Sequence, residues 1–529
     1  MSIPSPTSSD ELATLHDQPV KACQAGQFDM AKKLLDQIPL RDPEHAALLH
    51  TCGTLALKAG ELELAKKWIE QSIQIRPDPH VYNILHIAQA KLGAFADAIQ
   101  NAQHAVALEP NIPEFHYNLA VTLEQQDRIE EAATSYRRTL EIEPGHRAAR
   151  TRLATLAMGL GATDEAEQHF RHALALTPTD QTIRFGLSQA LLTAGRYEEG
   201  WSHFEARWTD DVNADRRVHA LRHQLPLAQW TGDVPNAANR VEKVHKRGAR
   251  LVVIPEQGYG DNLQFARYLP LALERFSHVG YICPRALRRL YQESLCSRWP
   301  GLVLVDPTRG GPRDWDWHCP LMSLPMAFGT RLDNVPARIP YLYAHTRRAA
   351  RWGTKLATLP EPNMPRIGLV WGGNSGFPMD RERSLTFTQI ASLLPLPNLR
   401  WISLQKINDP AKRSDRASHA RLIDWTDEIT DFADTAALIA NLDLVISVDT
   451  SVAHLAAAMG KPVWLLNRFA GCWRWLRDRE DSPWYPTVRI FTQSQRGNWD
   501  EVLARVAAAL VQHFPSQGRY RDEFPPLVT

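Results

Sequence analysis

A turn of polar residues follows the most apolar strand that the sequence predicts, and its residue types suit a phosphorylated sugar. Asp449, Thr450 and Ser451 come directly after the apolar run 444–448. Hydroxyl groups and backbone amides at the start of a helix bind phosphate well, because the positive end of the helix dipole lies there. A carboxylate fits poorly beside a phosphate but accepts hydrogen bonds from sugar hydroxyls. A nucleotide-sugar would meet both demands.

The residues around this turn predict a strand–helix–strand unit of a parallel sheet. The β-branched run 444–448 predicts a buried strand, and the small apolar residues from Val452 to Met459 suit a helix packed closely on that sheet. Gly460 and Pro462 end the helix, and residues 463–466 form the next strand. Open α/β sheets bind ligands at the carboxyl ends of their strands, which is where the polar turn falls.

Another carboxylate follows an earlier predicted strand, residues 250–254. Gly258 and Gly260 allow a tight turn, and Asp261 can cap a helix that runs to about Phe276. A carboxylate at such a turn could also take the proton from a hydroxyl group that attacks a ligand held between two domains. The residues alone leave both roles of Asp261 open, general base and plain helix cap.

Further polar side chains follow two more predicted strands of the C-terminal half, where a ligand of the same sheet would reach them: Asn374, Arg383, Ser384 and Lys406. Arginine can bind phosphate through two parallel hydrogen bonds, so Arg383 suits a diphosphate. A solvated loop is the alternative, because acidic residues stand between the arginines of that turn. Lys406 could equally be a surface residue.

The N-terminal part of the chain repeats itself with a period near 34 residues. Small residues recur at Ala31, Ala65, Ala98, Ala132, Ala166 and Gly200, and prolines recur at Pro43, Pro77, Pro110, Pro144 and Pro178. A small residue lets two antiparallel helices approach closely, and each repeat buries its apolar face only against its neighbours. This is the tetratricopeptide pattern. It predicts a superhelix whose groove holds a peptide, or alternatively a spacer or dimerisation platform.

Several other residues have more than one interpretation. Trp230 is interpreted as an anchor that packs the linker 206–239 onto the next domain. Glu256, Gln257 and His318 could face a ligand cleft, although a lone histidine is more often structural. Trp473, Trp484 and Tyr485 could line a nucleotide pocket, although packing in the core is the more common role of such residues.

The composition and charge of the chain limit the classes of partner that we expect. A net charge of +1 gives no general attraction to nucleic acid or anionic membranes. No apolar run reaches the roughly 18 residues that span a bilayer, and the N-terminus lacks the features of a signal peptide. The cysteines form no CxxC pair, and the turn at residues 258–260 does not match GxGxxG. We therefore expect a cytoplasmic protein without a bound cofactor or metal, for which homo-oligomers remain open.

Two motifs together resemble a known family. Gly260-Asp261, with a strand before it and FARYLP after it, looks like the N-terminal motif of the ADP-heptose heptosyltransferases, and residues 449–454, DTSVAH, match that family's D-T-[GS]-x-x-H turn. The resemblance implies that Asp261 is the catalytic base. It also implies that the turn contacts the donor sugar and phosphates through Asp449, Thr450, Ser451 and His454.

Two further resemblances extend this one. The segment LQKINDP is similar to the O-GlcNAc transferase segment that carries a donor-side lysine, which implies that Lys406 stabilises the departing diphosphate. The combination with tetratricopeptide repeats resembles bacterial repeat-containing glycosyltransferases. The implied fold class is α followed by α/β: a repeat superhelix over 1–210, then a GT-B pair of Rossmann-like domains over 211–350 (acceptor side) and 351–515 (nucleotide-sugar side), and a tail over 516–529.

The resemblance implies a metal-independent glycosyltransferase that moves a sugar from a nucleotide-sugar to an acceptor hydroxyl. The expected acceptor is a Ser or Thr of a protein bound by the repeats, with flagellin-like surface proteins as candidates. Two alternatives stay open. One is a non-catalytic repeat scaffold or chaperone, and the other is a glycosyltransferase that acts on a lipid-linked glycan.

Overall fold

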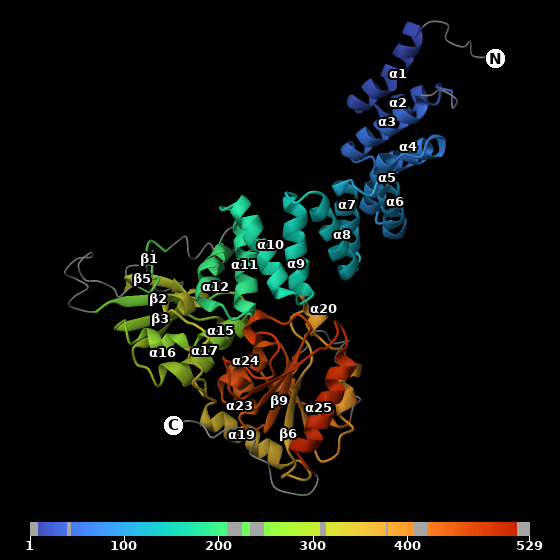
Figure 1. Cartoon of the computed structure of the whole chain (residues 1–529). Coiled ribbons are helices and arrows are strands. Elements are labelled where there is room, and N and C mark those ends of the chain that lie inside the picture. The colour runs from blue at the N-terminus through green and yellow to red at the C-terminus, as the bar shows by residue number, and fades with distance from the viewer. Residues whose placement is uncertain are drawn as a thin grey trace. The chain divides into compact units, whose positions relative to one another are not determined.

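The computed structural model describes residues 9–39, 44–208, 225–232, 248–306, 314–376, 379–406 and 420–515, without the side chains of residues 9–15. The chain divides into two compact units, Met1–Leu176 and Thr177–Thr529 (Figure 1). Pro43, part of the predicted linker 206–239 and the predicted tail 516–529 lie outside the described residues. The boundary between the units falls inside the range predicted for the repeats, and the predicted domain limits stay predictions.

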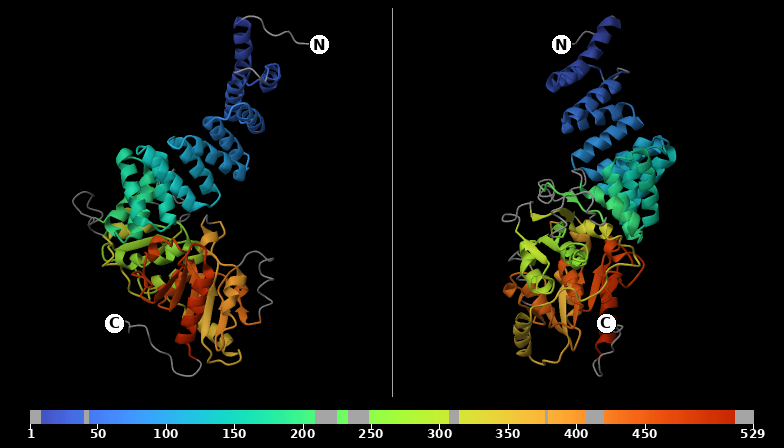
Figure 2. Two further views of the ribbon diagram at one scale, coloured as in Figure 1. Left: turned by 45° about the vertical axis from the view of Figure 1, so that its right-hand side comes forward. Right: turned by 90° about the vertical axis from the view of Figure 1, so that its left-hand side faces the viewer.

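The first unit is built from consecutive helices that pack as antiparallel pairs (Figure 2). The described helices are α1 (Ser9–Gln24), α2 (Phe28–Leu35), α3 (His45–Ala59), α4 (Leu62–Ile75), α5 (Pro79–Lys91), α6 (Phe95–Leu108), α7 (Pro113–Gln125), α8 (Ile129–Ile142), α9 (Arg147–Gly159) and α10 (Thr163–Leu176). The recurring small residues of this unit, Ala31 to Ala166, are all fully buried. Paired helices approach each other closely in this unit. For example, a Cβ on Gly53 of α3 would lie 2.6 Å from the Ile69 side chain of α4. The predicted helical repeat is confirmed.

The second unit begins with the helices α11 (Gln181–Thr193), α12 (Tyr197–Phe204) and η1 (Glu205–Trp208) and continues into a first sheet of parallel strands. Its strand order is β1-β5-β2-β3-β4. The strands are β1 (Ala228–Gln229), β2 (Arg250–Ile254), β3 (His278–Ile282), β4 (Leu302–Val305) and β5 (Trp317–Pro320). Its helical segments are α15 (Tyr259–Phe265), α16 (Tyr268–Ala272), α17 (Arg285–Tyr291), η4 (Gln292–Cys296), η6 (Leu321–Ser323) and α18 (Leu324–Ala327).

A second parallel sheet follows, with strand order β11-β10-β9-β6-β7-β8. Its strands are β6 (Arg366–Val370), β7 (Arg400–Ser403), β8 (Leu422–Asp424), β9 (Leu444–Val448), β10 (Val463–Asn467) and β11 (Val488–Thr492). Its helical segments are α19 (Thr346–Ala357), α20 (Asp380–Arg383), α21 (Phe387–Ile390), η7 (Ala391–Leu393), η8 (Thr426–Glu428), α23 (Phe432–Ile439), α24 (Ser451–Ala458), η9 (Trp473–Trp475) and α25 (Trp499–His513). Parallel sheets flanked by helices confirm the Rossmann-like prediction.

Strand order places the predicted turns where such sheets bind ligands. In the first sheet the chain leaves β2 toward β3 and β4, and later returns to the other side of β2 as β5. In the second sheet the same reversal lies between β6 and β9. Ligands of open α/β sheets bind beyond the carboxyl ends of the strands at such a reversal. Asp261 follows β2 and Asp449 follows β9.

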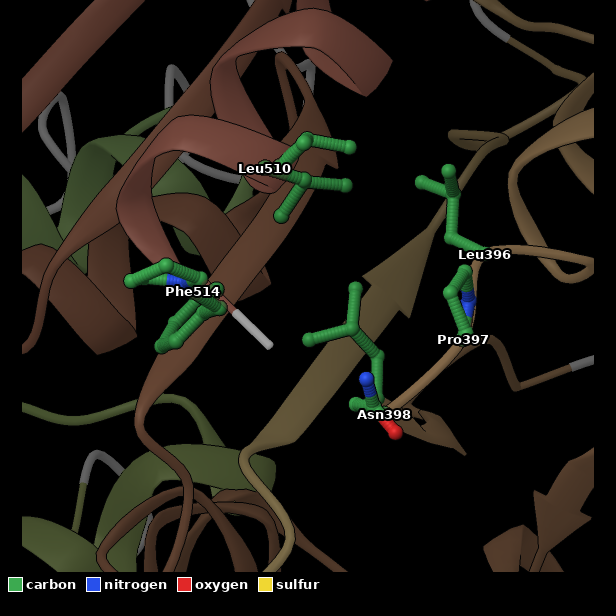
Figure 3. A pocket seen from close by; sticks show the side chains of 8 residues that line it. Leu396, Pro397, Asn398, Leu510 and Phe514 are labelled. Carbon is green, nitrogen blue, oxygen red and sulfur yellow. The ribbon is translucent and has the colours of Figure 1, made fainter. Parts of the chain in front are cut away.

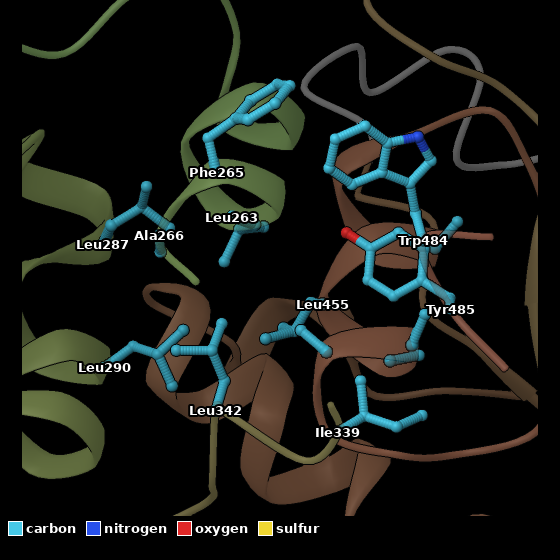
Figure 4. Packing of buried hydrophobic residues seen from close by; sticks show 14 of the residues in the cluster. Leu263, Phe265, Ala266, Leu287, Leu290, Ile339, Leu342, Leu455, Trp484 and Tyr485 are labelled. Atoms are coloured by element: carbon cyan, nitrogen blue, oxygen red, sulfur yellow. The ribbon is translucent and has the colours of Figure 1, made fainter. Parts of the chain in front are cut away.

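One hydrophobic core joins the two sheets. Side chains from α15, α17, the segment 339–342, α24 and the pair Trp484–Tyr485 pack together in it (Figure 4). The same core takes in Tyr197, Trp201 and Phe204 of α12. The Trp201 indole donates to the Thr330 carbonyl at 3.0 Å. The helices α11 and α12 therefore belong to the same packed body as the sheets.

The predicted anchor Trp230 is confirmed. Its side chain is buried, and its ring meets Phe276 and Phe328 edge to face at centroid distances of 5.1 and 5.3 Å.

The helix predicted to run from Asp261 to about Phe276 is broken: α15 ends at Phe265 and α16 begins at Tyr268. Pro270, which has no amide hydrogen to bond within a continuous helix, explains the break. No helix in the described ranges is long and apolar enough to cross a bilayer.

Candidate active site

Asp261 lies in the first turn of α15, just beyond the end of β2. Its Oδ2 accepts a hydrogen bond from the Gly258 amide at 3.0 Å, so the helix-cap role is confirmed. Its Oδ1 forms an ion pair with the Arg474 guanidinium. The side chain is 16% exposed, so it is not fully closed off from solvent. Its role as a base stays a prediction.

The turn that carries Asp261 packs directly against the turn at residues 449–454. A Cβ on Gly260 would lie 2.9 Å from His454 Cδ2 and 3.7 Å from Ser451 Cα. Glycine therefore permits α15 and the start of α24 to come this close, and the two helices pack together. Two motifs that lie about 190 residues apart in the sequence meet between the two sheets (Figure 1).

The start of α24 is not capped by the residue before it. Thr450 has extended backbone angles, and its side chain accepts no amide hydrogen of the helix. Its hydroxyl instead lies 2.9 Å from Ser447 Oγ, which itself donates to the Val448 carbonyl. The side chains of Asp449, Thr450 and Ser451 are half-buried rather than closed off. An uncapped helix start at the carboxyl end of a strand suits an anion.

Asp449 is held by a buried histidine. His454 Nε2 lies 3.7 Å from Asp449 Oδ1, and His454 Nδ1 lies 3.1 Å from the Tyr485 hydroxyl. The imidazole is buried and stacks on Trp475 at 5.1 Å between centroids. Burial by itself raises the pKa of Asp449, but the His454 hydrogen bond and the charges of His454, Arg474 and Arg383 outweigh it and lower the pKa to about 2. Asp449 is therefore ionised near neutral pH and can accept hydrogen bonds from sugar hydroxyls.

This lowered pKa predicts a pH-dependent contribution to stability. Because the folded-state pKa lies below the ordinary value of 3.8, the ionised group contributes stability above about pH 4 and loses it as the pH falls toward 2. We expect Asp449→Asn to cost about 2 kcal/mol at pH 7 and roughly half of that at pH 3. Calorimetric unfolding of both proteins across this range measures the difference.

The matched control is Asp333→Asn, because the Asp333 side chain is 73% exposed. This variant should unfold like the wild type at every pH. A deficit in Asp449→Asn that stayed the same from pH 7 to pH 3 would contradict the assigned environment of Asp449.

Arg383 and Ser384 are brought to the same turn. Arg383 Nη1 donates to the Asp449 carbonyl at 3.0 Å, and Ser384 Oγ accepts from the Gly373 amide at 2.9 Å. Gly373 lets the Arg383 guanidinium and the Asp380 carboxylate lie against the backbone here, because a Cβ would come within 2.5 Å of Asp380 Oδ1 and displace both side chains. The turns after β6 and β9 therefore form one continuous polar edge.

Two predicted donor contacts are less closely joined to this edge. Asn374 Oδ1 accepts from the Gly376 amide of its own turn at 3.1 Å. Lys406 is exposed, and its Nζ donates to the Ile429 carbonyl at 2.6 Å, just before α23. Within the described ranges, no hydrogen bond or ion pair joins either side chain to residues 449–454. Their donor roles stay predictions.

Arg474 was not among the predicted site residues. It follows β10 in η9, is 8% exposed, and pairs with Asp261 of the first sheet. Its guanidinium lies 4.3 Å from the Trp473 ring centroid, and Nη1 donates to Cys472 Sγ at 3.0 Å. Its place between two tryptophans shortly after a strand was a weak signal. Its partner lies 213 positions earlier, which the sequence pattern does not show.

Several other candidates are structural. Glu256 is buried and bonded by both Arg207 and the Met322 amide. His318 Nδ1 lies 3.0 Å from the Leu227 carbonyl within the first sheet. The Trp484 indole donates to the Tyr197 hydroxyl at 3.0 Å, and Trp473 packs beside it, so packing is confirmed for both tryptophans. Gln257 is exposed.

A cavity of about 200 Å³ lies elsewhere, between the segment before β7 and the end of α25 (Figure 3). Its lining consists of Leu396, Pro397, Asn398, Leu399, Leu510, Val511, Phe514 and Pro515. None of these residues carries a charge or belongs to the predicted site.

In the part of the chain that the structure describes, no three His, Cys, Asp or Glu side chains are grouped to hold a metal ion. The prediction of a metal-independent, cofactor-free reaction stays a prediction.

The turn at Asp449 lies inside a segment that matches a known family. Residues 429–466 match glycosyltransferase family 9 (heptosyltransferase). Residues 87–147 and 157–225 match tetratricopeptide repeats. The family 9 match runs from just before α23 into β10 and supports a glycosyltransferase activity, while the repeats suggest protein–protein interaction. The similarity of the Lys406 segment to O-GlcNAc transferases stays a prediction.

A known protein is similar to part of the chain. Protein FlbA of Caulobacter vibrioides (strain ATCC 19089 / CIP 103742 / CB 15) is 29% identical over 315 residues, which are 55% of this chain and 49% of FlbA. The chain thus spans about half the length of this relative.

Two solved structures resemble shorter stretches. A crystal structure of MamA is 24% identical and covers 29% of this chain and 91% of its own, with a TM-score of 0.27. A tetratricopeptide repeat protein from Parabacteroides merdae ATCC 43184 is 18% identical, covers 38% and 80%, and has a TM-score of 0.33.

Proposed function

We propose that the chain is a metal-independent glycosyltransferase of the GT-B class that moves a sugar from a nucleotide-sugar to an acceptor hydroxyl. The observation that carries this proposal is the contact between the Asp261 turn on one sheet and the uncapped start of α24 on the other. A candidate base and a candidate phosphate site lie together at the strand-order reversals of both sheets.

The second sheet would hold the donor. The first amides of α24 and the Arg383 guanidinium offer positive charge to a diphosphate, which lowers the cost of its departure. Thr450 and Ser451 add hydroxyl groups to the same edge. Asp449, ionised and half-buried, would accept hydrogen bonds from the sugar hydroxyls and so orient the anomeric carbon.

Asp261 would act on the acceptor. The acceptor oxygen forms a bond to the anomeric carbon while the bond from that carbon to the diphosphate oxygen breaks. The acceptor proton passes to the Asp261 carboxylate, and the electron pair of the broken bond leaves with the nucleoside diphosphate. The partly exposed carboxylate of Asp261 faces the junction between the two sheets, where such a reaction would occur.

The tetratricopeptide repeats favour a protein acceptor. Repeat arrays of this kind present an extended surface to a partner, and a Ser or Thr side chain of that partner would supply the hydroxyl. Flagellin-like surface proteins remain candidates.

The donor site is tested by calorimetric titration with UDP, ADP, GDP and CMP. We expect one of these nucleotides to bind, and we expect Arg383→Gln to weaken that binding about tenfold, because a phosphate-binding guanidinium is lost. Arg381→Gln is the matched control: Arg381 lies on the same short helix but is exposed, so its loss should leave the affinity unchanged. Failure of every nucleotide to bind the wild type would contradict the proposed donor site.

A further inference from the structure

Arg474 connects the two halves of the proposed site. Its guanidinium pairs with Asp261, the proposed base on the first sheet. Its charge also lowers the pKa of Asp449, on the second sheet. The short helix η9 that carries Arg474 lies over the start of α24, because the neighbouring Trp475 stacks on His454. A single buried cation therefore lies at the meeting point of the base, the sugar-orienting carboxylate and the phosphate site.

The bonding of Arg474 is incomplete. A guanidinium has five N–H donors. Nη2 faces Asp261, Nη1 donates to a sulfur atom, which is a weak acceptor, and Nε is buried with no hydrogen-bond partner among the described residues. Although burial lowers the pKa of Arg474, the charges of Asp261, Cys472 and Asp449 raise it above the ordinary value, so the group stays positive. A charged and under-bonded arginine would gain from a better acceptor.

A diphosphate is such an acceptor. It offers several anionic oxygens and can bind arginine through two parallel hydrogen bonds. Asp261 already satisfies one of its own oxygens with the Gly258 amide, so it can lose Arg474 and keep its place on α15.

We propose that Arg474 is shared between the base and the donor: it pairs with Asp261 in the empty enzyme and turns to the diphosphate when the nucleotide-sugar binds. Binding of the donor thereby frees Asp261 to accept a proton. This inference rests on the proposed function and adds to it the order in which the steps occur. The donor binds first, and the base becomes available only when a sugar is present.

The test is a double-mutant cycle read by nucleotide affinity. Wild type, Asp261→Asn, Arg474→Gln and the double variant are titrated calorimetrically with whichever of UDP, ADP and GDP binds the wild type. Because Asp261 competes with the diphosphate for Arg474, Asp261→Asn should bind that nucleotide about three- to tenfold more tightly than the wild type. Arg474→Gln should bind it about tenfold more weakly, and adding Asp261→Asn to that variant should change nothing further.

Two further variants keep the result interpretable. Arg474→Lys retains the charge, so it should keep most of the gain from Asp261→Asn even if the glutamine variant does not fold. Arg479→Gln is the matched control, because Arg479 lies in the same segment but pairs with the exposed Asp481. It should bind nucleotide like the wild type.

A plain structural ion pair predicts a different pattern. If Asp261→Asn leaves the affinity unchanged, or tightens it equally with and without Arg474, the sharing of Arg474 is wrong while the donor site stands. If none of UDP, ADP, GDP and CMP binds the wild type, the proposed function fails and this inference fails with it.

Discussion

Replacement of Asp261 by asparagine is expected to lower the rate of sugar transfer by about a hundred- to ten-thousand-fold, the usual contribution of a general base. Asparagine cannot take the acceptor proton. Its side-chain oxygen can still accept the Gly258 amide hydrogen, so α15 keeps its cap and the protein should fold normally. The measurement is product formation over time with a nucleotide-sugar donor, at saturating donor for both proteins.

The control for this variant is Asp180→Asn. Asp180 is the N-cap of α11, with its carboxylate 3.1 Å from the Ile183 amide, and within the described residues no hydrogen bond or ion pair joins it to Asp261, Arg474 or residues 449–454. It should transfer sugar at the wild-type rate. Undiminished transfer by Asp261→Asn would rule out the base role and leave Asp261 as a helix cap.

Replacement of Arg207 by alanine is expected to destabilise the second unit by about 3–5 kcal/mol. Arg207 is 5% exposed and binds Glu256 through two hydrogen bonds, at 2.7 and 3.1 Å. It also binds Glu205 and Ser323, at 2.7 Å each. Its removal would leave buried carboxylates without a cation. Thermal or denaturant unfolding followed by tryptophan fluorescence would show an earlier transition.

An exposed arginine provides the comparison. Arg137 pairs with Glu165 on the surface of the first unit, and its side chain is 43% exposed. Arg137→Ala should shift unfolding by less than about 1 kcal/mol. Equal effects of the two substitutions would show that the Arg207 cluster does not stabilise the contact between η1 and the first sheet.

Local pattern was enough to predict the elements around the proposed donor site. The strand predicted at 444–448 is β9, and the small residues after it form α24. The repeat period was also enough to predict where helices pack together, since the recurring alanines are buried where helices meet. Both signals come from neighbouring residues on one strand or helix, so they survive without knowledge of the tertiary fold.

The sequence predicted less well where the outcome depends on distant partners. Arg474 and Glu256 are both charged residues beside turns, yet Arg474 pairs with Asp261 at the proposed site, whereas Glu256 pairs with Arg207 in the core. Residue type gives no information on which partner is found, because these pairings form only after the two sheets and η1 pack together. Lys406 and Asn374 illustrate the converse: they are suitable residue types after suitable strands, but within the described residues their hydrogen bonds go to Ile429 and Gly376, so their donor roles stay predictions.

The central claim is that an activated sugar binds between Asp261 and the start of α24. A crystal structure of the chain with the nucleoside diphosphate that binds it tests this most directly. We expect phosphate oxygens within hydrogen-bond distance of the first amides of α24 and of Arg474, and Asp261 released from its ion pair. A nucleotide bound elsewhere, for example in the apolar cavity beside α25, with the turn at residues 449–454 empty, would contradict the account.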